Sequence, residues 1–237
     1  AFAKFFGAVV NMLKKRLIFT LLFNKGNFML SRNFRLQKVG DLKWLQKNYN
    51  FERISFFIDE LIVLDVTREH RDVADFCEKL QALTQGCFAP IAAGGGVRDI
   101  DHARSLLRSG ADKVVINTPL YDYPAFVSQL SSEFGEQCVV ASMDVKQGSD
   151  GLYQVWTDCG RRYLDCSFQK QIEEIAKSTV GEIYLNSMDK DGTGQGYDMH
   201  LLDFLPSDMS KMLIMAGGGG NAKHLAQGLA DPRIDAV

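Results

Sequence analysis

The sequence lacks the features that mark several specialised classes of protein. Its five cysteines are odd in number and none forms a Cys-x-x-Cys pair, which argues against a disulfide framework or a zinc site and fits a cytoplasmic setting. No segment reaches the roughly 18 uninterrupted apolar residues of a membrane helix. A formal charge of −2 and a pI near 6.1 give no basic field for nucleic acid. We expect a soluble protein without metal, cofactor, nucleic acid or membrane partner.

The stretch 90–118 contains one complete βαβ unit. Apolar residues 91–93 run into Gly94, Gly95 and Gly96, and a helix with one apolar face follows until Gly110. Glycines between a strand and a helix let backbone N–H groups approach an anion, which the helix N-terminus also favours. Taken alone, the turn is either a phosphate site or simply a tight connection.

The second half of the chain repeats this pattern. Residues 213–220 again form an apolar strand followed by glycines, and Gly217 lies 123 positions after Gly94. Asp65 and Asp189 end comparable strands at an offset of 124. Two halves of four strands each predict eight parallel strands that close on themselves. The predicted fold is therefore an α/β protein of the (β/α)8 TIM-barrel class with a two-fold internal repeat.

We expect one barrel domain over residues 12–237, a normal size for this fold. Residues 1–11 lack the pattern of a signal peptide and are interpreted as an extension or tag. The sequence ends within the last predicted strand, so the barrel looks truncated at its C-terminal end. A second interpretation stays open, in which residues 1–11 complete this eighth strand as a permuted segment.

Apolar patterns also predict the remaining elements. The first strand is expected over 16–23 with a return strand over 28–34, the fifth over 138–143, and an inserted hairpin over 151–164. The loop 188–197 is polar and rich in glycine, which indicates either a substrate cover at the barrel mouth or a solvated turn.

Catalytic groups in such a barrel lie where the strands end. The sequence places there the carboxylates of Asp65, Asp144 and either Asp189 or Asp191, which could serve as general acid or base. Donors for two phosphates are expected at the same end, in the two glycine turns and in the loops after strands four and six: Gly95, Gly96, Asn117, Thr118, Gly192, Thr193, Gly217 and Gly218. We therefore expect a long substrate that is phosphorylated at both ends.

The opposite end carries four charges at strand starts, namely Arg16, Glu60, Lys113 and Glu182. Buried charges need partners, and here two cations face two anions. Such a ring could be a structural plug or a gate for a small polar molecule, and spacing alone favours the plug.

Three blocks of sequence together resemble the cyclase subunit of imidazole glycerol phosphate synthase. They are Gly94-Gly-Gly-Val-Arg with 110–118, Val139-Val-Ala-Ser-Met-Asp-Val-Lys, and Ser187-Met-Asp-Lys-Asp-Gly-Thr with Gly196-Tyr-Asp. The resemblance implies a two-fold repeated barrel that receives ammonia from a glutaminase docked on its floor. It also implies that the ammonia travels along the axis to a bis-phosphorylated ribonucleotide.

The resemblance implies roles for individual residues. Asp144 matches the catalytic acid, and the four floor charges match the ammonia gate, which reverses the preference for a plug. Phosphate positions of the family are matched by Gly96, Asn117, Thr118, Gly192 and Gly218.

One position departs from the family. Its first strand ends in an aspartate that acts as general base, and a lysine follows on the return strand, but here Leu22 and Leu30 stand at those places. The repeat also makes Leu22 the counterpart of Asp144. Loss of a general base typically costs about 10²–10⁴ in rate. The chain thus resembles the cyclase-like branch encoded with surface-polysaccharide genes, which supplies amidation of a sugar.

Three hypotheses follow. The chain delivers ammonia for amidation of a phosphorylated or nucleotide-linked sugar, or it is a working histidine-pathway cyclase that uses Asp144 with a displaced base. In the third, it is a non-catalytic conduit or scaffold.

Overall fold

The structure, a computed structural model, describes residues 15–48, 51–54 and 56–237. The interpretation of residues 1–11 lies outside this range. Seven parallel strands stand side by side in a curved sheet whose order is β11-β10-β7-β6-β5-β4-β1. Their bounds are β1 Ile18–Asn24, β4 Glu60–Asp65, β5 Ile91–Gly94, β6 Lys113–Ile116, β7 Val139–Gln147, β10 Glu182–Ser187 and β11 Met212–Ala216.

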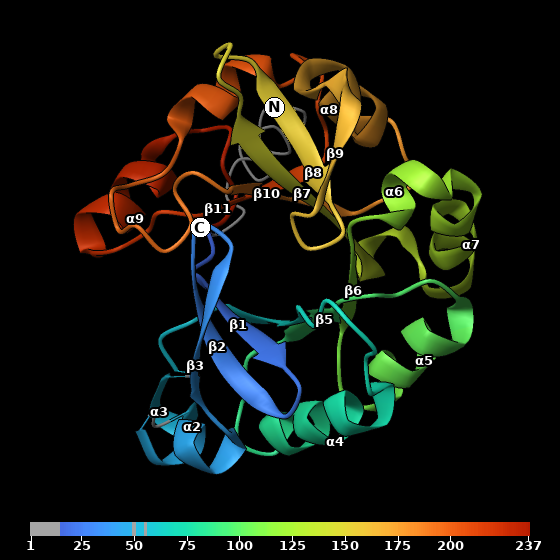
Figure 1. Cartoon of the computed structure of the whole chain (residues 1–237), viewed down its shortest axis with the longest axis vertical. Helices are drawn as coiled ribbons and strands as arrows, with labels where there is room; N and C mark the ends of the chain where they lie inside the picture. The colour runs from blue at the N-terminus through green and yellow to red at the C-terminus, as the bar shows by residue number, and fades with distance from the viewer. Residues whose placement is uncertain (1–14, 49–50, 55) are drawn as a thin grey trace, which may run out of the picture.

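Residues 235–237 occupy the eighth position of the ring. Ala236 forms parallel bridges to Arg16 on one side and to Ile214 on the other. The amide of Arg16 donates to the carbonyl of Asp235 at 2.9 Å, and the amide of Met215 donates to that of Ala236 at 2.9 Å. These bonds join β11 to β1 and close the sheet, so the TIM-barrel prediction is confirmed (Figure 1).

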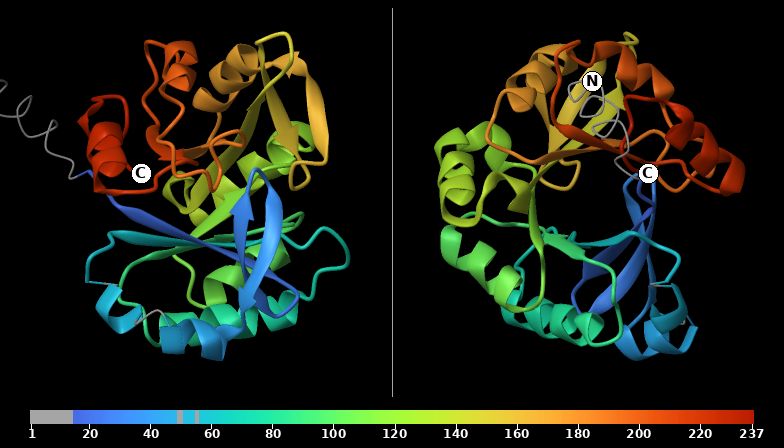
Figure 2. Two further views of the ribbon diagram at one scale, coloured as in Figure 1. Left: turned by 60° about the vertical axis from the view of Figure 1, so that its left-hand side comes forward. Right: turned by 180° about the vertical axis from the view of Figure 1, so that it is seen from behind.

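Helices surround the strands on the outside of the ring (Figures 1 and 2). Each of four helices begins at a side chain that accepts a hydrogen bond from its first turn, namely Asp72, Asp99, Ser167 and Asn221. The helices are α2 Leu42–Asn48, α3 Phe51–Ile54, α4 Val73–Thr84, α5 Ile100–Arg108, α6 Pro119–Asp122, α7 Pro124–Phe134, α8 Phe168–Ala176 and α9 Ala222–Ala230, with 3-10 turns η1 Glu136–Cys138 and η2 Met199–Phe204. Within the described residues, no helix combines the length and apolarity needed to cross a bilayer.

Each half of the barrel inserts an antiparallel hairpin directly after its first strand. In the first half this is β2 (Asn27–Arg32) with β3 (Arg35–Gly40), and in the second it is β8 (Tyr153–Thr157) with β9 (Arg162–Ser167). Both hairpins rise on the same side of the ring (Figure 2, left).

Two strand predictions were wrong in detail. The return strand expected over 28–34 is β2 followed by a tight turn at Asn33 and Phe34, whose φ values are 50° and 62°, and then β3. The strand β3 has little signal in the sequence because it lies at the outer edge, where three of its six residues are polar and exposed. The fifth strand continues past Asp144 to Gln147 because this extension pairs with β8.

The register of the strands corrects the repeat offset to 122. Leu64 pairs with Gly94 and Asn186 with Ala216, so Gly95 corresponds to Gly217. Asp65 therefore corresponds to Ser187, and the proposed match to Asp189 was wrong. The match of Gly94 to Gly217 arose because one half has three consecutive glycines and the other four, and Asp189 was misaligned because it lies two residues beyond the end of β10.

Side chains inside the ring alternate along each strand and form layers. A buried layer above the floor comprises Ile62, Ala92, Val115, Val140, Tyr184, Ile214 and Ala236, with Ile18 packed against it. The floor charges lie below this layer, because Glu60 and Glu182 precede Ile62 and Tyr184 by two positions. The mouth lies above it.

Candidate active site

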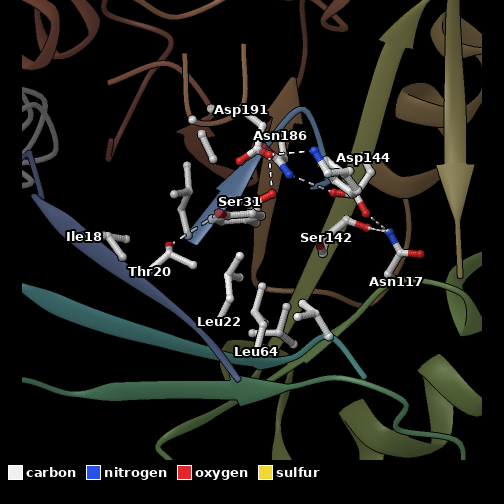
Figure 3. Close-up of a pocket in the computed structure, with 18 of the residues that line it drawn as sticks. Ile18, Thr20, Leu22, Ser31, Leu64, Asn117, Ser142, Asp144, Asn186 and Asp191 are labelled. Carbon is white, nitrogen blue, oxygen red and sulfur yellow. Dashed lines mark hydrogen bonds between the residues drawn. The ribbon is translucent and has the colours of Figure 1, made fainter. Parts of the chain in front are cut away.

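A cavity of about 740 Å³ opens at the mouth of the barrel (Figure 3). Inward-facing side chains at the upper ends of β1, β4, β7 and β10 line it, together with both glycine turns and the β2–β3 hairpin. The hollow also extends past β1, where Leu17, Phe19 and Leu225 line it.

Asp144 is the buried acid of this cavity. Its Oδ1 accepts a hydrogen bond from Asn186 Nδ2 at 2.9 Å, and its Oδ2 accepts one from Asn117 Nδ2 at 3.2 Å. Burial raises the pKa of Asp144 to about 7; the bond from Asn186 opposes this shift, and the charge of Asp191 adds to it. A carboxyl group with such a pKa can donate or accept a proton near neutral pH.

Leu22 occupies the position that mirrors Asp144. Leu22 pairs with Leu64 across β1 and β4, as Asp144 pairs with Asn186 across β7 and β10, and both members of the first pair lie 122 positions before those of the second. Figure 3 shows the two leucines on one wall and the acid with its amide on the other. The first half therefore has an apolar pair where the second has a hydrogen-bonded acid–amide pair.

The two glycine turns adopt conformations that other residues avoid. Gly95 and Gly96 have φ values of 114° and 69°, and Gly217 and Gly218 have values of 81° and 102°. A side chain on Gly95 would lie 2.1 Å from the carbonyl oxygen of Asp65, so the close approach requires glycine. Helices α5 and α9 start just after these turns, which places their N-termini at the mouth.

Asp65 ends β4 beside an arginine that sequence reasoning missed. Its Oδ2 lies 3.7 Å from Arg71 Nε, and Arg71 Nη2 donates to the sulfur of Cys159 at 3.5 Å. Burial raises the pKa of Asp65, although bonds from Thr67 and the charge of Arg71 oppose this. Arg71 Nε is buried and makes no hydrogen bond. A side chain on Gly96 would meet the Arg71 side chain, so this arginine covers the first glycine turn.

The loop after β10 is joined to the β2–β3 hairpin. Asp191 Oδ2 accepts hydrogen bonds from Ser31 Oγ at 2.5 Å and from the amide of Phe34 at 2.9 Å. Gly192 has a φ of 63° and leaves no room for a side chain, because its Cβ would lie 1.9 Å from the carbonyl oxygen of Ser31. Thr193 does not line the cavity, and its hydroxyl donates to the carbonyl of Lys190 at 2.8 Å.

The β8–β9 hairpin lies over the first half of the barrel. The hydroxyl of Thr118 accepts a hydrogen bond from the amide of Asp158 at 3.2 Å. Arg68 Nη2 donates to the carbonyls of Phe34 at 2.9 Å and Cys159 at 3.3 Å, which connects the tips of both hairpins. Entry to the mouth is therefore framed by two arms.

The four floor charges meet in a closed ring. Arg16 Nη1 lies 2.7 Å from Glu60 and 3.1 Å from Glu182, and Lys113 Nζ lies 2.9 Å from each glutamate. Both glutamates are 2% exposed. Burial lowers the pKa of Arg16, but the hydrogen bond and charge of Glu182 with that of Glu60 outweigh this and leave it raised. Every member of the ring is paired with two opposite charges.

The strand periodicity could have revealed Asn186, since Glu182 faces inward and the alternation then turns Tyr184 and Asn186 the same way. Arg71 has no such signal, because it follows an irregular loop. Asp189 accepts a hydrogen bond from the amide of Gln147 at 2.8 Å, as a structural loop aspartate does. Among the residues placed by the structure, no three His, Cys, Asp or Glu side chains gather as a metal site would require.

These features define an α/β-barrel protein built from two half-barrels, with a cavity that holds a buried acid at one end and a paired ring of charges at the other. The family model described as "Histidine biosynthesis protein" matches residues 36–237. The chain is 43% identical over 226 residues to the "Putative imidazole glycerol phosphate synthase subunit hisF2" of Parasynechococcus marenigrum (strain WH8102), covering 95% of this chain and 84% of that protein. It is 32% identical over 227 residues to the "Imidazole glycerol phosphate synthase subunit HisF" of Alkaliphilus metalliredigens (strain QYMF), covering 95% and 88%. The chain therefore belongs to the histidine biosynthesis protein family, as a HisF-type cyclase-subunit homologue.

Proposed function

We propose that this chain is the ammonia-delivering subunit of a cytoplasmic glutamine amidotransferase complex. A glutaminase docks on the floor, ammonia enters through the ring of Arg16, Glu60, Lys113 and Glu182, and an acceptor receives it at the mouth. One observation carries the proposal: the floor ring is intact while Leu22 stands where the repeat calls for a second carboxylate. The entry machinery is retained and the reaction centre is altered.

Exposed aromatic side chains support docking on the floor. Phe56, Phe57 and Phe88 are 75%, 69% and 78% exposed, and the rings of Phe56 and Phe88 lie 6.1 Å apart. They precede the starts of β4 and β5, at the same end of the barrel as Glu60. Clustered exposed aromatics are typical of protein interfaces. A glutaminase that covers them would also cover the entrance to the ring.

The acceptor is proposed to be a phosphorylated or nucleotide-linked sugar of a surface polysaccharide. The glycine turns at the N-termini of α5 and α9 supply backbone donors for its phosphate groups. Gly95, Gly96, Gly217 and Gly218 would approach these groups, with Asn117, Thr118, Asp65, Asp191 and Gly192 nearby, whereas Thr193 lies outside the cavity. The 43% identity to a relative named hisF2, against 32% to one named HisF, supports a branch apart from the histidine pathway.

One observation favours a second candidate, a working histidine-pathway cyclase. Asp144 is kept, its pKa is raised to about 7, and Asn117 and Asn186 hold it in place. Asp144 would then serve as the acid with a displaced base. The apolar wall at Leu22 and Leu64 instead favours a conduit in which a partner performs the chemistry.

The test combines the protein with its glutaminase, glutamine and the ribonucleotide substrate of the cyclase, and follows imidazole glycerol phosphate. We expect little product from the native chain and a gain of about 10²-fold or more from Leu22→Asp combined with Leu30→Lys, because a general base is restored. Leu152→Asp, on an exposed turn outside the cavity, is the control. Full turnover by the native chain would refute the proposal. If the double variant gained no activity, the loss of cyclase activity would come from remodelling of the whole pocket and not from the missing base alone.

A further inference from the structure

We infer that the mouth cavity binds a phosphorylated ligand that carries a short alkyl or acyl group. This group would lie against the wall that the first half of the barrel forms with Leu22, Met29 and Leu64. The phosphate part rests on the proposed function. The apolar part rests on the side chains of β1, β2 and β4. It adds to the proposed function the chemical class of the acceptor.

The wall has an apolar centre formed by three side chains in neighbouring strands. Leu22 is paired with Met29 of β2 on one side and with Leu64 of β4 on the other, so the three lie in adjacent register positions. Toward the floor the same face of β1 carries Thr20 and then Ile18, whereas Leu30 follows Met29 directly in β2 and turns to the other face of that strand. Leu22, Met29 and Leu64 line the cavity, and none of them is fully buried. The molecule thus leaves a patch of aliphatic surface open toward its own mouth.

The opposite wall is polar, and its groups are already engaged with one another. Asn117 and Asn186 both donate to Asp144, and Asn117 also donates to the carbonyl of Ser142 at 3.0 Å. A sugar hydroxyl could exchange into this network. The same hydroxyl placed on Leu22 or Leu64 would lose its water without gaining a partner, at a cost of about 1–3 kcal/mol. The wall therefore selects a ligand surface without polar groups.

The internal repeat sets this wall apart from its counterpart by more than the missing carboxylate. Removing a proton acceptor needs only one substitution, at position 22. Here both counterparts of the Asp144–Asn186 pair are leucines, and Met29 continues the surface onto the hairpin. Such a surface can bury an aliphatic group, and each methylene it covers strengthens binding about fourfold.

Alkyl phosphates test the inference directly. Isothermal titration of the full chain would compare inorganic phosphate with methyl, ethyl, propyl and butyl phosphate. We expect butyl phosphate to bind at least about 10-fold more tightly than methyl phosphate, allowing for a wall that is open on one side. Leu22→Asn, which is neutral and leaves the electrostatics unchanged, should remove most of this gain and leave inorganic phosphate within about twofold. Leu152→Asn, with an exposed leucine outside the cavity, should keep the gain.

The outcomes separate the two claims. If phosphate binds but all the alkyl phosphates bind with equal affinity, the inferred alkyl-binding wall is refuted and the proposed function still stands. If Leu22→Asn still binds butyl phosphate more tightly than methyl phosphate, the alkyl-binding wall is also refuted, because the alkyl group would then bind elsewhere. Failure of inorganic phosphate and of every alkyl phosphate to bind overturns the inference together with the phosphate sites of the proposed function. Melting curves of both variants establish that they are folded.

Discussion

Replacing Asp144 with asparagine should change how the stability of the protein depends on pH. Burial raises the pKa of this carboxyl from 3.8 to about 7, so the folded chain holds its proton over a range in which the unfolded chain has released it. Ionisation of Asp144 therefore opposes folding. Its contribution is absent below pH 3.8, grows as the pH rises, and levels off above about 7.

The size of this loss of stability follows from the pKa values of Asp144 in the unfolded and folded chain. A difference of about three pH units corresponds to roughly 4 kcal/mol of stability lost at high pH, of which more than half is lost between pH 5 and pH 8. The Asp144→Asn variant has no such titration, so the native chain should lose this amount relative to the variant over that interval. The asparagine also places an amide near Asn117 or Asn186, which lowers stability by about 1 kcal/mol at every pH and cancels in the comparison.

The assay is urea unfolding at a series of pH values, with the free energy of unfolding extrapolated to water and the slope checked for constancy. Asp150→Asn, at an exposed carboxylate on the β7–β8 turn, controls for the removal of a charge. We expect the curves of Asp144→Asn and the native chain to diverge above pH 5 and those of Asp150→Asn and the native chain to stay parallel. If all three were parallel, burial would not control the titration of Asp144, and its assignment as an acid near neutral pH would fail.

Two further predictions concern the floor. Lys113→Met removes a cation that contacts both Glu60 and Glu182, so we expect the free energy of unfolding to fall by about 3 kcal/mol and glutamine to be hydrolysed without product formation. Lys113→Arg should largely restore both. If glutamine hydrolysis stayed coupled to product formation in Lys113→Met, the ring would be a structural plug. Phe56→Ala combined with Phe88→Ala should weaken glutaminase binding at least about 10-fold by titration without changing the melting temperature, since both rings are exposed, and equal affinity would move the docking surface elsewhere.

Much of the fold could be predicted from local pattern. The buried strands are short apolar runs, and each glycine turn stands between a strand and a capped helix, so the positions of β5 and α5 were predicted closely. The four floor charges could be predicted to meet because parallel strands begin at the same end of a barrel. These features depend on short local sequence patterns and on the rule that the parallel strands of a barrel all begin at the same end.

Features set by contacts between distant segments could not be predicted in the same way. Half of the residues of β3 are polar and exposed, and the segment forms a strand because β2 pairs with it. Arg71 follows no periodic pattern, and its place over Gly96 depends on the path of the loop after β4. The raised pKa of Asp144 depends on burial by the whole ring, which no local stretch encodes.

The two hairpins have a consequence for how the duplicated halves depend on each other. The first-half arm is anchored on the second half, where Asn33 donates from its backbone to the carbonyl of Asp191 at 2.9 Å and from its side chain to that of Asp189 at 2.9 Å. The second-half arm is anchored on the first, through Arg68 and Thr118. Each half thus holds the arm of the other, and either one produced alone would lose both the strand neighbours at its edges and the anchor of its arm. The repeat remains visible in the spacing of the chain, whereas the contacts that hold each arm cross from one half to the other.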